Sequence, residues 1–70
     1  MLPNTFYERS DPKYKHLIGK QIELMYKKKK WVGIARFIGI NDFHKQFQVT
    51  LDRTPLWPVD PSTIKERKVG

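Results

Sequence analysis

The sequence predicts a mostly-β domain in which five antiparallel strands close into a small barrel. Residues 21–26 and 46–51 alternate apolar and polar side chains with the period of two that marks a half-buried strand. Five prolines, together with this period, exclude a helical bundle. The 70 residues suffice for a single core, and closing the sheet would leave few unpaired strand edges.

Residues 1–17 are predicted to form an N-terminal arm, and residues 18–70 to form the barrel domain. The arm has neither strand nor helix periodicity and contains two prolines. A single helical turn is expected near its end, with Asp11 as the N-cap and Pro12 at the first helical position. We expect the aromatic side chains of the arm to cover one end of the barrel: Phe6, Tyr7 and Tyr14.

The first two strands are expected on either side of a run of four lysines. In residues 21–26, Ile22, Leu24 and Tyr26 share the inward face. Residues 31–41 then form a long, curved strand, which glycines interrupt where a small barrel needs sharp bends. The inward side chains of this strand are expected to be Ile34, Ile38 and Ile40.

Arg36 falls among these inward isoleucines, and two explanations of its position remain open. The strand either changes phase at Gly33, so that Arg36 turns outward, or Arg36 lies on a concave functional surface. The first explanation makes the arginine an ordinary solvent-exposed strand residue. The second makes it part of a binding site.

The C-terminal half is predicted to alternate short strands and tight turns. Asn41 and Asp42 favour a turn, after which residues 46–51 form the clearest strand of the sequence. Its inward face is Phe47, Val49 and Leu51, and its outward face is Gln46, Gln48 and Thr50. A fourth strand is expected at residues 56–59, where Pro58 requires an edge position or a bulge.

The last predicted strand follows a single helical turn. Asp60 has the side chain of a helix N-cap, and Pro61 suits the first helical position. Residues 64–69 then complete the sheet, with Ile64 buried at the start. The predicted core of the domain is one cluster: Ile22, Leu24, Ile34, Ile38, Phe47, Val49, Leu51 and Ile64.

The order of these elements resembles the Src-homology-3-like superfamily of small barrels, which includes Tudor, KOW and integrase C-terminal domains. The resemblance covers residues 18–68 and lies in the topology, above all in the helical turn before the last strand. Residues 33–43, GIARFIGINDF, are also similar to CAP-Gly domains, where a strand of this kind precedes a phenylalanine-containing turn. CAP-Gly domains capture acidic C-terminal tails through a GKNDG motif, but LDRTPLWPVD stands in its place here, so tail binding is not implied.

The sequence lacks the residue patterns of enzymes, cofactor sites and metal centres. It has no cysteine, and His16 and His44 are far apart without ligand spacing around them. No nucleophile–base pattern, paired carboxylates or Gly-rich phosphate loop is present, so we expect a non-enzyme without cofactor, metal or small-molecule substrate. No apolar run reaches about 20 residues and the N-terminus has no signal-peptide core, which predicts a cytoplasmic protein without a membrane segment.

The net charge of +7 favours an acidic partner, either nucleic acid or an acidic protein surface. The positive charge is concentrated in residues 21–45, which carry six basic and two acidic side chains. A short, lysine-rich chain without cysteine is also typical of small proteins encoded by phages or mobile elements. Two hypotheses of function follow from the charge and the aromatic residues.

The first hypothesis is a nucleic-acid-binding module. Basic side chains would hold the phosphate backbone, and neighbouring aromatic rings would stack on bases or wedge against a duplex. The predicted contacts are Lys27, Lys28, Lys29, Lys30, Trp31, Arg36, Phe43 and Lys45. The four lysines are also typical of a solvated hairpin tip that discourages edge pairing, so they do not settle the function.

The second hypothesis is a protein-interaction module or accessory subunit that docks on an acidic partner through Tyr26, Trp31, Phe43 and Trp57. Trp57 with Pro58 resembles the aromatic and proline wall with which small barrels hold extended peptides, although core packing also explains each tryptophan. The two hypotheses predict different surfaces. The first predicts a continuous basic face with an exposed aromatic ring, and the second predicts an exposed apolar patch with lysines at its rim.

Overall fold

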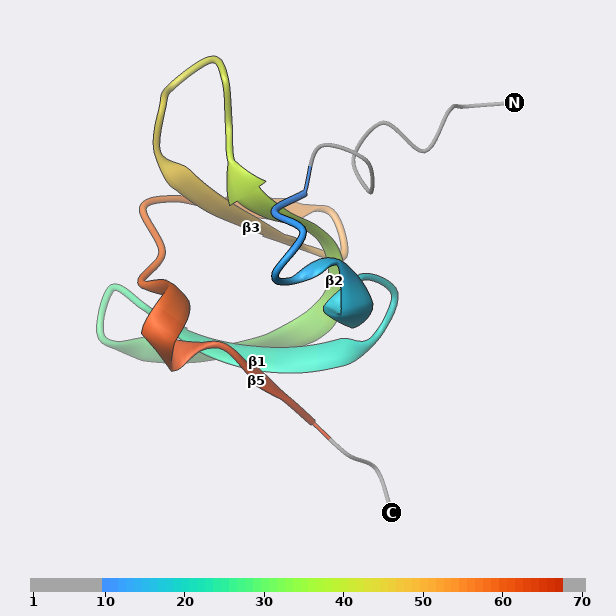
Figure 1. Cartoon of the computed structure of the whole chain (residues 1–70). Coiled ribbons are helices and arrows are strands. Elements are labelled where there is room, and N and C mark those ends of the chain that lie inside the picture. Colours follow the sequence, from blue (N-terminus) through green and yellow to red (C-terminus); the bar gives the residue numbers. More distant parts are fainter. Residues whose placement is uncertain (1–9, 68–70) are drawn as a thin grey trace.

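The computed structural model describes residues 10–67 of the chain (Figure 1). Five strands form one antiparallel sheet in the order β4-β3-β2-β1-β5, which confirms the predicted mostly-β class with five antiparallel strands. The strands are β1 (Gln21–Tyr26), β2 (Lys29–Ile40), β3 (Phe47–Leu51), β4 (Thr54–Leu56) and β5 (Lys65–Glu66). Two 3-10 helices, η1 (Lys15–Leu17) and η2 (Pro61–Thr63), precede β1 and β5. The strands β4 and β5 are the two ends of the sheet order, and closure into a barrel stays a prediction.

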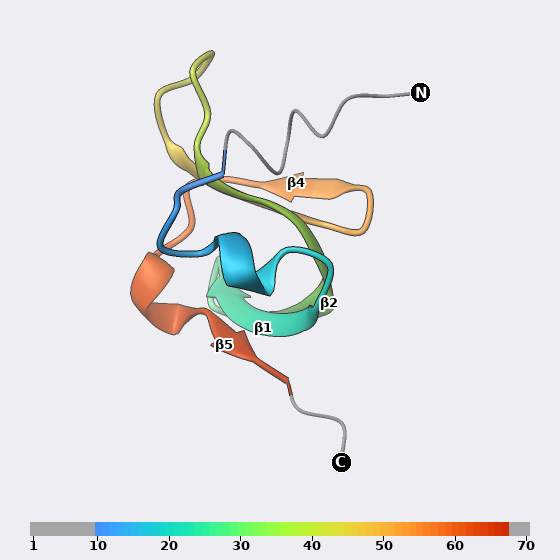
Figure 2. The same cartoon turned by 45° about the vertical axis from the view of Figure 1, so that its right-hand side comes forward.

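The long strand β2 connects two halves of the sheet. Its first half, residues 29–34, pairs with β1, and its second half, residues 35–40, pairs with β3. Figures 1 and 2 show β2 bending between these halves, so that β1 and β5 lie in one layer and β3 and β4 lie in another. The predicted long, curved strand is therefore confirmed.

A β-bulge at Arg36 reverses the inward and outward sides of β2. The pairing with β3 shifts between Ala35 and Phe37, so Arg36 is the additional residue. Ala35 is fully buried before the bulge, and Ile38 is fully buried after it. The predicted change of phase is confirmed, but it occurs at Arg36 and not at Gly33.

The predicted inward face of β2 contains two errors, and the bulge explains the first of them. Ile34 lies before the bulge and has the parity of the outward side, so it is only half-buried and is not part of the core cluster. Ile40 has the inward parity but occupies the last position of β2, where it is 60% exposed. Ala35 takes the place in the core that the sequence pattern assigns to Ile34.

The core is one cluster that draws on both halves of the sheet. Five of the predicted residues are buried in it: Ile22, Leu24, Ile38, Val49 and Leu51. Phe47 and Ile64 are half-buried and pack against it. The cluster also contains residues that were not predicted: Leu17, Ala35, Leu56 and Val59. Because Leu17 belongs to the cluster, the end of the predicted arm contributes to the core of the domain.

The strands β1 and β2 are joined by a two-residue turn of Lys27 and Lys28. Tyr26 pairs with Lys29 across the turn, and the two turn residues have φ of 51° and 66°. Positive φ at both central positions is what a type I′ turn requires, and the twist of this turn matches that of paired strands. The predicted tip of four lysines is therefore too long: Lys29 and Lys30 belong to β2, because so short a turn lets the strand resume at once.

The strand β4 covers Thr54–Leu56, two residues earlier than the predicted 56–59. Asp52 has a φ of 54° and forms a tight turn from β3 directly into β4. Pro55 consequently lies in the edge strand, and Pro58 follows the strand instead of interrupting it.

The predicted helical turn before the last strand is confirmed as η2. Asp60 Oδ1 accepts the Ser62 N–H at 2.9 Å, and Pro61 opens the turn. Of the predicted strand at residues 64–69, Lys65 and Glu66 form β5. Residues 68 and 69 lie outside the described part of the chain.

The described end of the N-terminal arm is attached to β2. The Asp11 N–H donates to the Ile38 carbonyl at 2.8 Å, and the Ile38 N–H donates to the Ser10 hydroxyl at 3.2 Å. Asp11 Oδ1 also accepts the Lys13 N–H at 2.9 Å, and the Asp11 carbonyl accepts the Tyr14 N–H at 2.8 Å, so Asp11 opens a turn. The predicted N-cap at Asp11 is wrong, because the helix η1 begins only at Lys15 and its N-cap position is Tyr14.

One aromatic residue of the arm can be placed on the sheet. Tyr14 meets Phe47 edge-on, with ring centroids 5.8 Å apart. Phe6 and Tyr7, which were also predicted to cover the barrel, lie outside the described residues.

Candidate functional site

Trp57, in the loop after β4, lies where three parts of the chain meet. Its carbonyl accepts a hydrogen bond from the Tyr26 hydroxyl at 3.0 Å, which ties the loop to the end of β1. The His44 ring, from the loop between β2 and β3, stacks on the indole with centroids 4.2 Å apart and planes 11° apart. Trp57 therefore joins the β1–β2 hairpin to the β2–β3 loop, and 39% of it is exposed.

Both ring nitrogens of His44 have hydrogen-bond partners. Nδ1 accepts the Gln46 N–H at 3.2 Å, and Nε2 lies 2.8 Å from Gln48 Oε1. Because Nδ1 accepts a backbone N–H, the proton of the neutral ring belongs on Nε2, which donates to Gln48. These bonds hold the imidazole against Trp57, so the two stacked rings keep a fixed orientation.

Gln48 is the centre of this hydrogen-bond network. Its Oε1 also accepts from Asn41 Nδ2 at 3.0 Å, and its Nε2 donates to the Thr50 hydroxyl at 2.9 Å. Gln48 lies on the outward face of β3, as the sequence predicts, but the β2–β3 loop folds over it and leaves 8% exposed. An amide whose oxygen and nitrogen both have partners can be buried at little cost.

The β2–β3 loop presents Phe43 to solvent. Asn41 Oδ1 accepts the Phe43 N–H at 2.7 Å, and the Lys45 N–H donates to the Asn41 carbonyl at 2.8 Å. These bonds confirm the predicted turn at Asn41. Phe43 is 95% exposed and lines a shallow hollow with His44 and Trp57, so its ring is not folded over the core.

The aromatic residues predicted to bind a protein partner are connected in the structure. Trp31 meets Tyr26 edge-on, with ring centroids 6.1 Å apart, and Tyr26 bonds to Trp57. Phe43 adjoins Trp57 through the hollow that they share. Trp31 is half-buried against the core, so it supports Tyr26 and does not offer a free ring face. We refer to Tyr26, Phe43, His44 and Trp57 as the aromatic surface.

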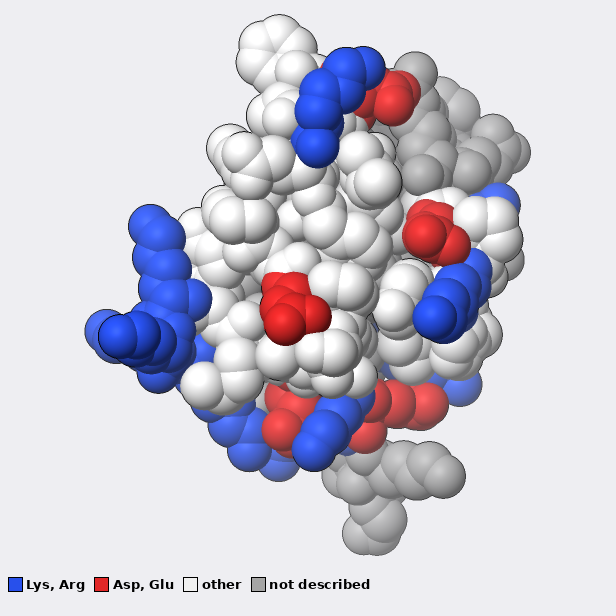
Figure 3. Space-filling view, turned by 60° about the vertical axis from the view of Figure 1, so that its left-hand side comes forward, with Lys and Arg blue, Asp and Glu red and all other residues white. Residues whose placement is uncertain are grey.

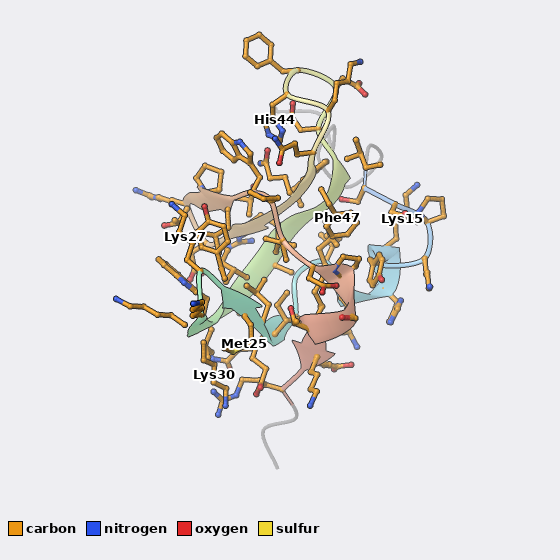
Figure 4. All side chains as sticks on the ribbon, turned by 90° about the vertical axis from the view of Figure 1, so that its left-hand side faces the viewer. Lys15, Met25, Lys27, Lys30, His44 and Phe47 are labelled. Carbon is orange, nitrogen blue, oxygen red and sulfur yellow. The ribbon has the colours of Figure 1, made fainter. Side chains whose placement is uncertain are left out.

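The lysine run does not form one cationic strip. Lys27 Nζ lies 5.4 Å from the centroid of the Tyr26 ring, at the edge of the aromatic surface. Lys30, in β2, forms an ion pair with Glu23 at 3.4 Å. Figure 4 shows Lys27 and Lys30 apart on the hairpin, with Lys27 on the side nearer His44.

The remaining basic residues of the nucleic-acid hypothesis lie elsewhere. Arg36 stands on the bulge of β2, and Lys45 lies in the β2–β3 loop with a φ of 61°. Figure 3 shows a face on which most side chains are uncharged, with an acidic side chain near its middle and basic side chains around its edge. The structure therefore brings together the predicted aromatic contacts but separates the predicted basic contacts.

Comparisons with known proteins give no match: neither a protein family, nor a curated protein, nor a solved structure matches this chain. Within residues 10–67, no three His, Asp or Glu side chains are grouped closely enough to hold a metal ion. In the same part of the chain, no helix has the length and apolar character needed to cross a membrane.

Two residues of the site, His44 and Gln48, were missed by sequence reasoning, and so was Arg53, which lines a neighbouring hollow together with Arg36. A histidine beside an exposed phenylalanine in a turn is the one local signal for His44, and it does not indicate a tryptophan as the stacking partner. Gln48 has the pattern of an ordinary outward strand residue. Arg53 reaches the surface near Arg36 only through the register of β2, β3 and β4.

Proposed function

We propose that this chain is a non-enzymatic protein-interaction module that docks on an acidic partner protein through the aromatic surface. The observation that carries the proposal is the continuity of this surface around Trp57, which bonds to Tyr26 and stacks on His44. Exposed aromatic side chains held rigidly contribute large contact area at a low cost in conformational entropy. The expectation of a cytoplasmic protein is kept as part of this proposal.

The distribution of charge supports an acidic partner. Basic side chains surround the largely uncharged face seen in Figure 3, although an acidic side chain lies near its middle, and Lys27 Nζ lies over the Tyr26 ring of the aromatic surface. Charges at the rim of an interface accelerate association with an oppositely charged partner and disfavour other partners, while the aromatic centre supplies most of the binding energy.

We also propose that the chain belongs to the Src-homology-3-like superfamily of small barrels. The sheet order β4-β3-β2-β1-β5 and the position of η2 between β4 and β5 support membership of the Src-homology-3-like superfamily. The bent β2, which pairs with β1 and then with β3, supports a small barrel of this type. Small β domains of this kind commonly bind extended segments along aromatic surfaces.

Nucleic acid is the second candidate partner. The observation in its favour is Phe43, which is 95% exposed in the same loop as Lys45 and so has a ring face free to stack on a base. Trp31 is weaker support for nucleic-acid binding than Phe43, because its ring is half-buried against Tyr26 and the core.

Selection from a random-peptide library displayed on phage tests the proposal. The immobilised full chain should enrich peptides that combine acidic and apolar residues. Trp57→Ala should weaken the binding of those peptides by about tenfold or more, because an aromatic side chain at the centre of an interface dominates its affinity. Val32→Ala is the control, since Val32 is also 39% exposed but lies outside the aromatic surface.

Failure to enrich any peptide above the Trp57→Ala variant would contradict the proposal. Fluorescence-anisotropy titrations with single-stranded and duplex oligonucleotides complete the test. An affinity for oligonucleotides that falls steeply with salt, without peptide binding, would replace the first candidate with the second.

A further inference from the structure

A second hollow lies on the outward face of β3, next to the aromatic surface. It has a volume of about 500 Å³ and is lined by Arg36, Gln48, Thr50, Asp52, Arg53 and Pro55. The hollow at Trp57, of about 460 Å³, shares Gln48 and Pro55 with it. The two hollows therefore form one groove along β3, with arginines at one end and aromatic rings at the other.

Two local features place the arginines at this end of the groove. Arg36 is the additional residue of the β2 bulge, and bulges characteristically redirect a side chain. Arg53 belongs to the tight turn between β3 and β4. Within residues 10–67, the ion pairs join Lys20 to Glu66 and Lys30 to Glu23, so neither guanidinium is paired with a carboxylate of the described chain.

Asp52 is the one carboxylate that lines this hollow, and its charge is directed at the backbone of β2. Its Oδ1 accepts the Ile34 N–H at 3.4 Å. A Cβ on Gly33 would lie 2.7 Å from Asp52 Oδ2, so the glycine is what permits the carboxylate to approach the strand. Two guanidinium groups and one carboxylate leave a net charge of one positive unit.

We propose that the groove binds an extended acidic segment of the partner, with one Asp or Glu side chain held between Arg36 and Arg53. Guanidinium groups bind carboxylates through paired, charge-assisted hydrogen bonds, which are stronger than neutral ones. An apolar side chain of the same segment occupies the hollow lined by Phe43, His44 and Trp57. The inference rests on the proposed function and adds the chemistry of the segment to it.

The spacing of the two partner residues follows from β3. Of the β3 residues, Gln48 lines both hollows and Thr50, two positions away on the same face of the strand, lines the arginine hollow alone. Side chains two residues apart on an extended peptide are separated by about 7 Å along the same face. The acidic and apolar residues of the partner are therefore two positions apart.

The groove suits a single carboxylate better than a nucleic-acid strand. A strand carries one negative charge per nucleotide and needs a series of cations along its path. Beyond Arg36 and Arg53, the groove continues over the uncharged Gln48, Pro55 and Trp57. Only the arginine end of the groove is lined by basic side chains.

The first experiment is an NMR titration of the isotopically labelled full chain with three short synthetic peptides. The first contains Glu-Gly-Phe, the second contains Gln-Gly-Phe, and the third contains Glu-Phe so that the two side chains point to opposite faces. Glu-Gly-Phe should shift the Nε–H signals of Arg36 and Arg53 and the indole N–H signal of Trp57. The other two peptides should bind about tenfold more weakly, which is the loss expected for one charge-assisted contact.

Arg67 supplies the internal control, because its side chain is exposed and lies outside the groove. Shifts of Arg36 and Arg53 no larger than that of Arg67 would overturn the inference. A shift at Trp57 without shifts at the two arginines would leave the aromatic docking surface intact and overturn only the carboxylate site. No shift at any of these residues would contradict the proposed function as well.

A charge reversal sharpens the assignment. Arg53→Glu should reduce the affinity for Glu-Gly-Phe and raise the affinity for Lys-Gly-Phe, because the sign at the arginine end of the groove is then inverted. Lys65→Glu changes the net charge equally but lies on β5, outside the groove, and should leave the preference unchanged. Equal effects of the two variants would mean that only the net charge matters.

A single-stranded thymidine oligonucleotide is the last probe. If it shifts Arg36 and Arg53 and the Glu-Gly-Phe peptide does not, the groove binds phosphate, and the carboxylate inference is wrong. The two-dimensional amide spectrum of each variant, recorded before titration, shows whether the fold is retained.

Discussion

The loops at the two ends of β2 differ in how their sequences relate to their structures. The densest run of charge in the chain begins in the β1–β2 turn, yet only Lys27 and Lys28 form this turn, and Lys27 contacts one ring, that of Tyr26. The β2–β3 loop has the pattern of an ordinary polar turn, yet it covers Gln48 and places His44 on Trp57. A run of charge therefore indicates exposure, whereas the organised surface depends on polar contacts between residues distant in the chain.

The largest effect is expected at the centre of the β2–β3 loop. Gln48→Ala removes the partner of His44, Asn41 and Thr50 at a site that is 8% exposed. We expect the free energy of unfolding to fall by about 1–3 kcal/mol, because partly buried polar groups lose their partner. Urea denaturation measures the change.

Gln46→Ala is the matched control for Gln48→Ala. Gln46 is exposed and contributes its backbone, not its side chain, to the bonds of the loop. Its replacement should change the free energy of unfolding by no more than about 0.5 kcal/mol. Equal losses for the two variants would contradict the structural role given to the Gln48 amide.

A stabilising effect of intermediate size is expected at the other loop. Lys27→Asn combined with Lys28→Gly puts the residues that tolerate positive φ where φ is 51° and 66°. The free energy of unfolding should rise by about 1 kcal/mol, because the strain of two left-handed lysines is relieved. Lys29→Gly should instead destabilise, since Lys29 is already in β2. A lower melting temperature for the double variant would contradict the two-residue turn.

A smaller effect on stability is expected at a third loop, which Asp60 caps. Hydrogen bonds from the Ser62 N–H and hydroxyl lower the pKa of Asp60 from its ordinary value of 3.8. Because the folded pKa is the lower one, this stabilisation is present above the unfolded pKa and is lost as the pH falls through the folded pKa. Thermal melts in acid should therefore fall less steeply for Asp60→Asn than for the unaltered chain, and parallel curves would contradict the capping role.

The smallest effect is expected for the lysine run itself. Replacing Lys27, Lys28, Lys29 and Lys30 with Gln should change the free energy of unfolding by no more than about 0.5 kcal/mol, because exposed charges and single surface ion pairs contribute little. Chemical denaturation of this variant beside Gln48→Ala compares the two loops directly. A loss as large as that of Gln48→Ala would mean that the run has a structural role that the described contacts do not reveal.

The strands β1 and β3 could be predicted because every second side chain in each is apolar and lies in the core cluster or against it. The inward face of β2 could not, since a bulge adds one residue without changing composition, and the isoleucines before and after Arg36 look equivalent in sequence. The start of β4 was misplaced because Pro55 and Pro58 are both compatible with an edge strand, and the tight turn at Asp52 decides between them.

The members of the aromatic surface were easier to predict than its geometry. Tyr26, Phe43 and Trp57 could be identified because large aromatic side chains are recognisable binding candidates from residue type alone. Their arrangement depends on loops that close over β3, and no local pattern encodes the stacking of His44 on Trp57. The groove beside them was not predicted at all, because it combines a bulge in one strand with a turn between two others.

The attachment of Ser10 and Asp11 to Ile38 has a practical consequence for shortened versions of this chain. These two residues occupy the edge of the second half of β2 that faces away from β3. Removing them would leave the N–H and carbonyl of Ile38 without these partners, and an uncovered strand edge is a template for self-association. A version that starts at residue 12 should therefore aggregate or dimerise at concentrations where one that starts at residue 10 stays monomeric, as analytical ultracentrifugation would reveal.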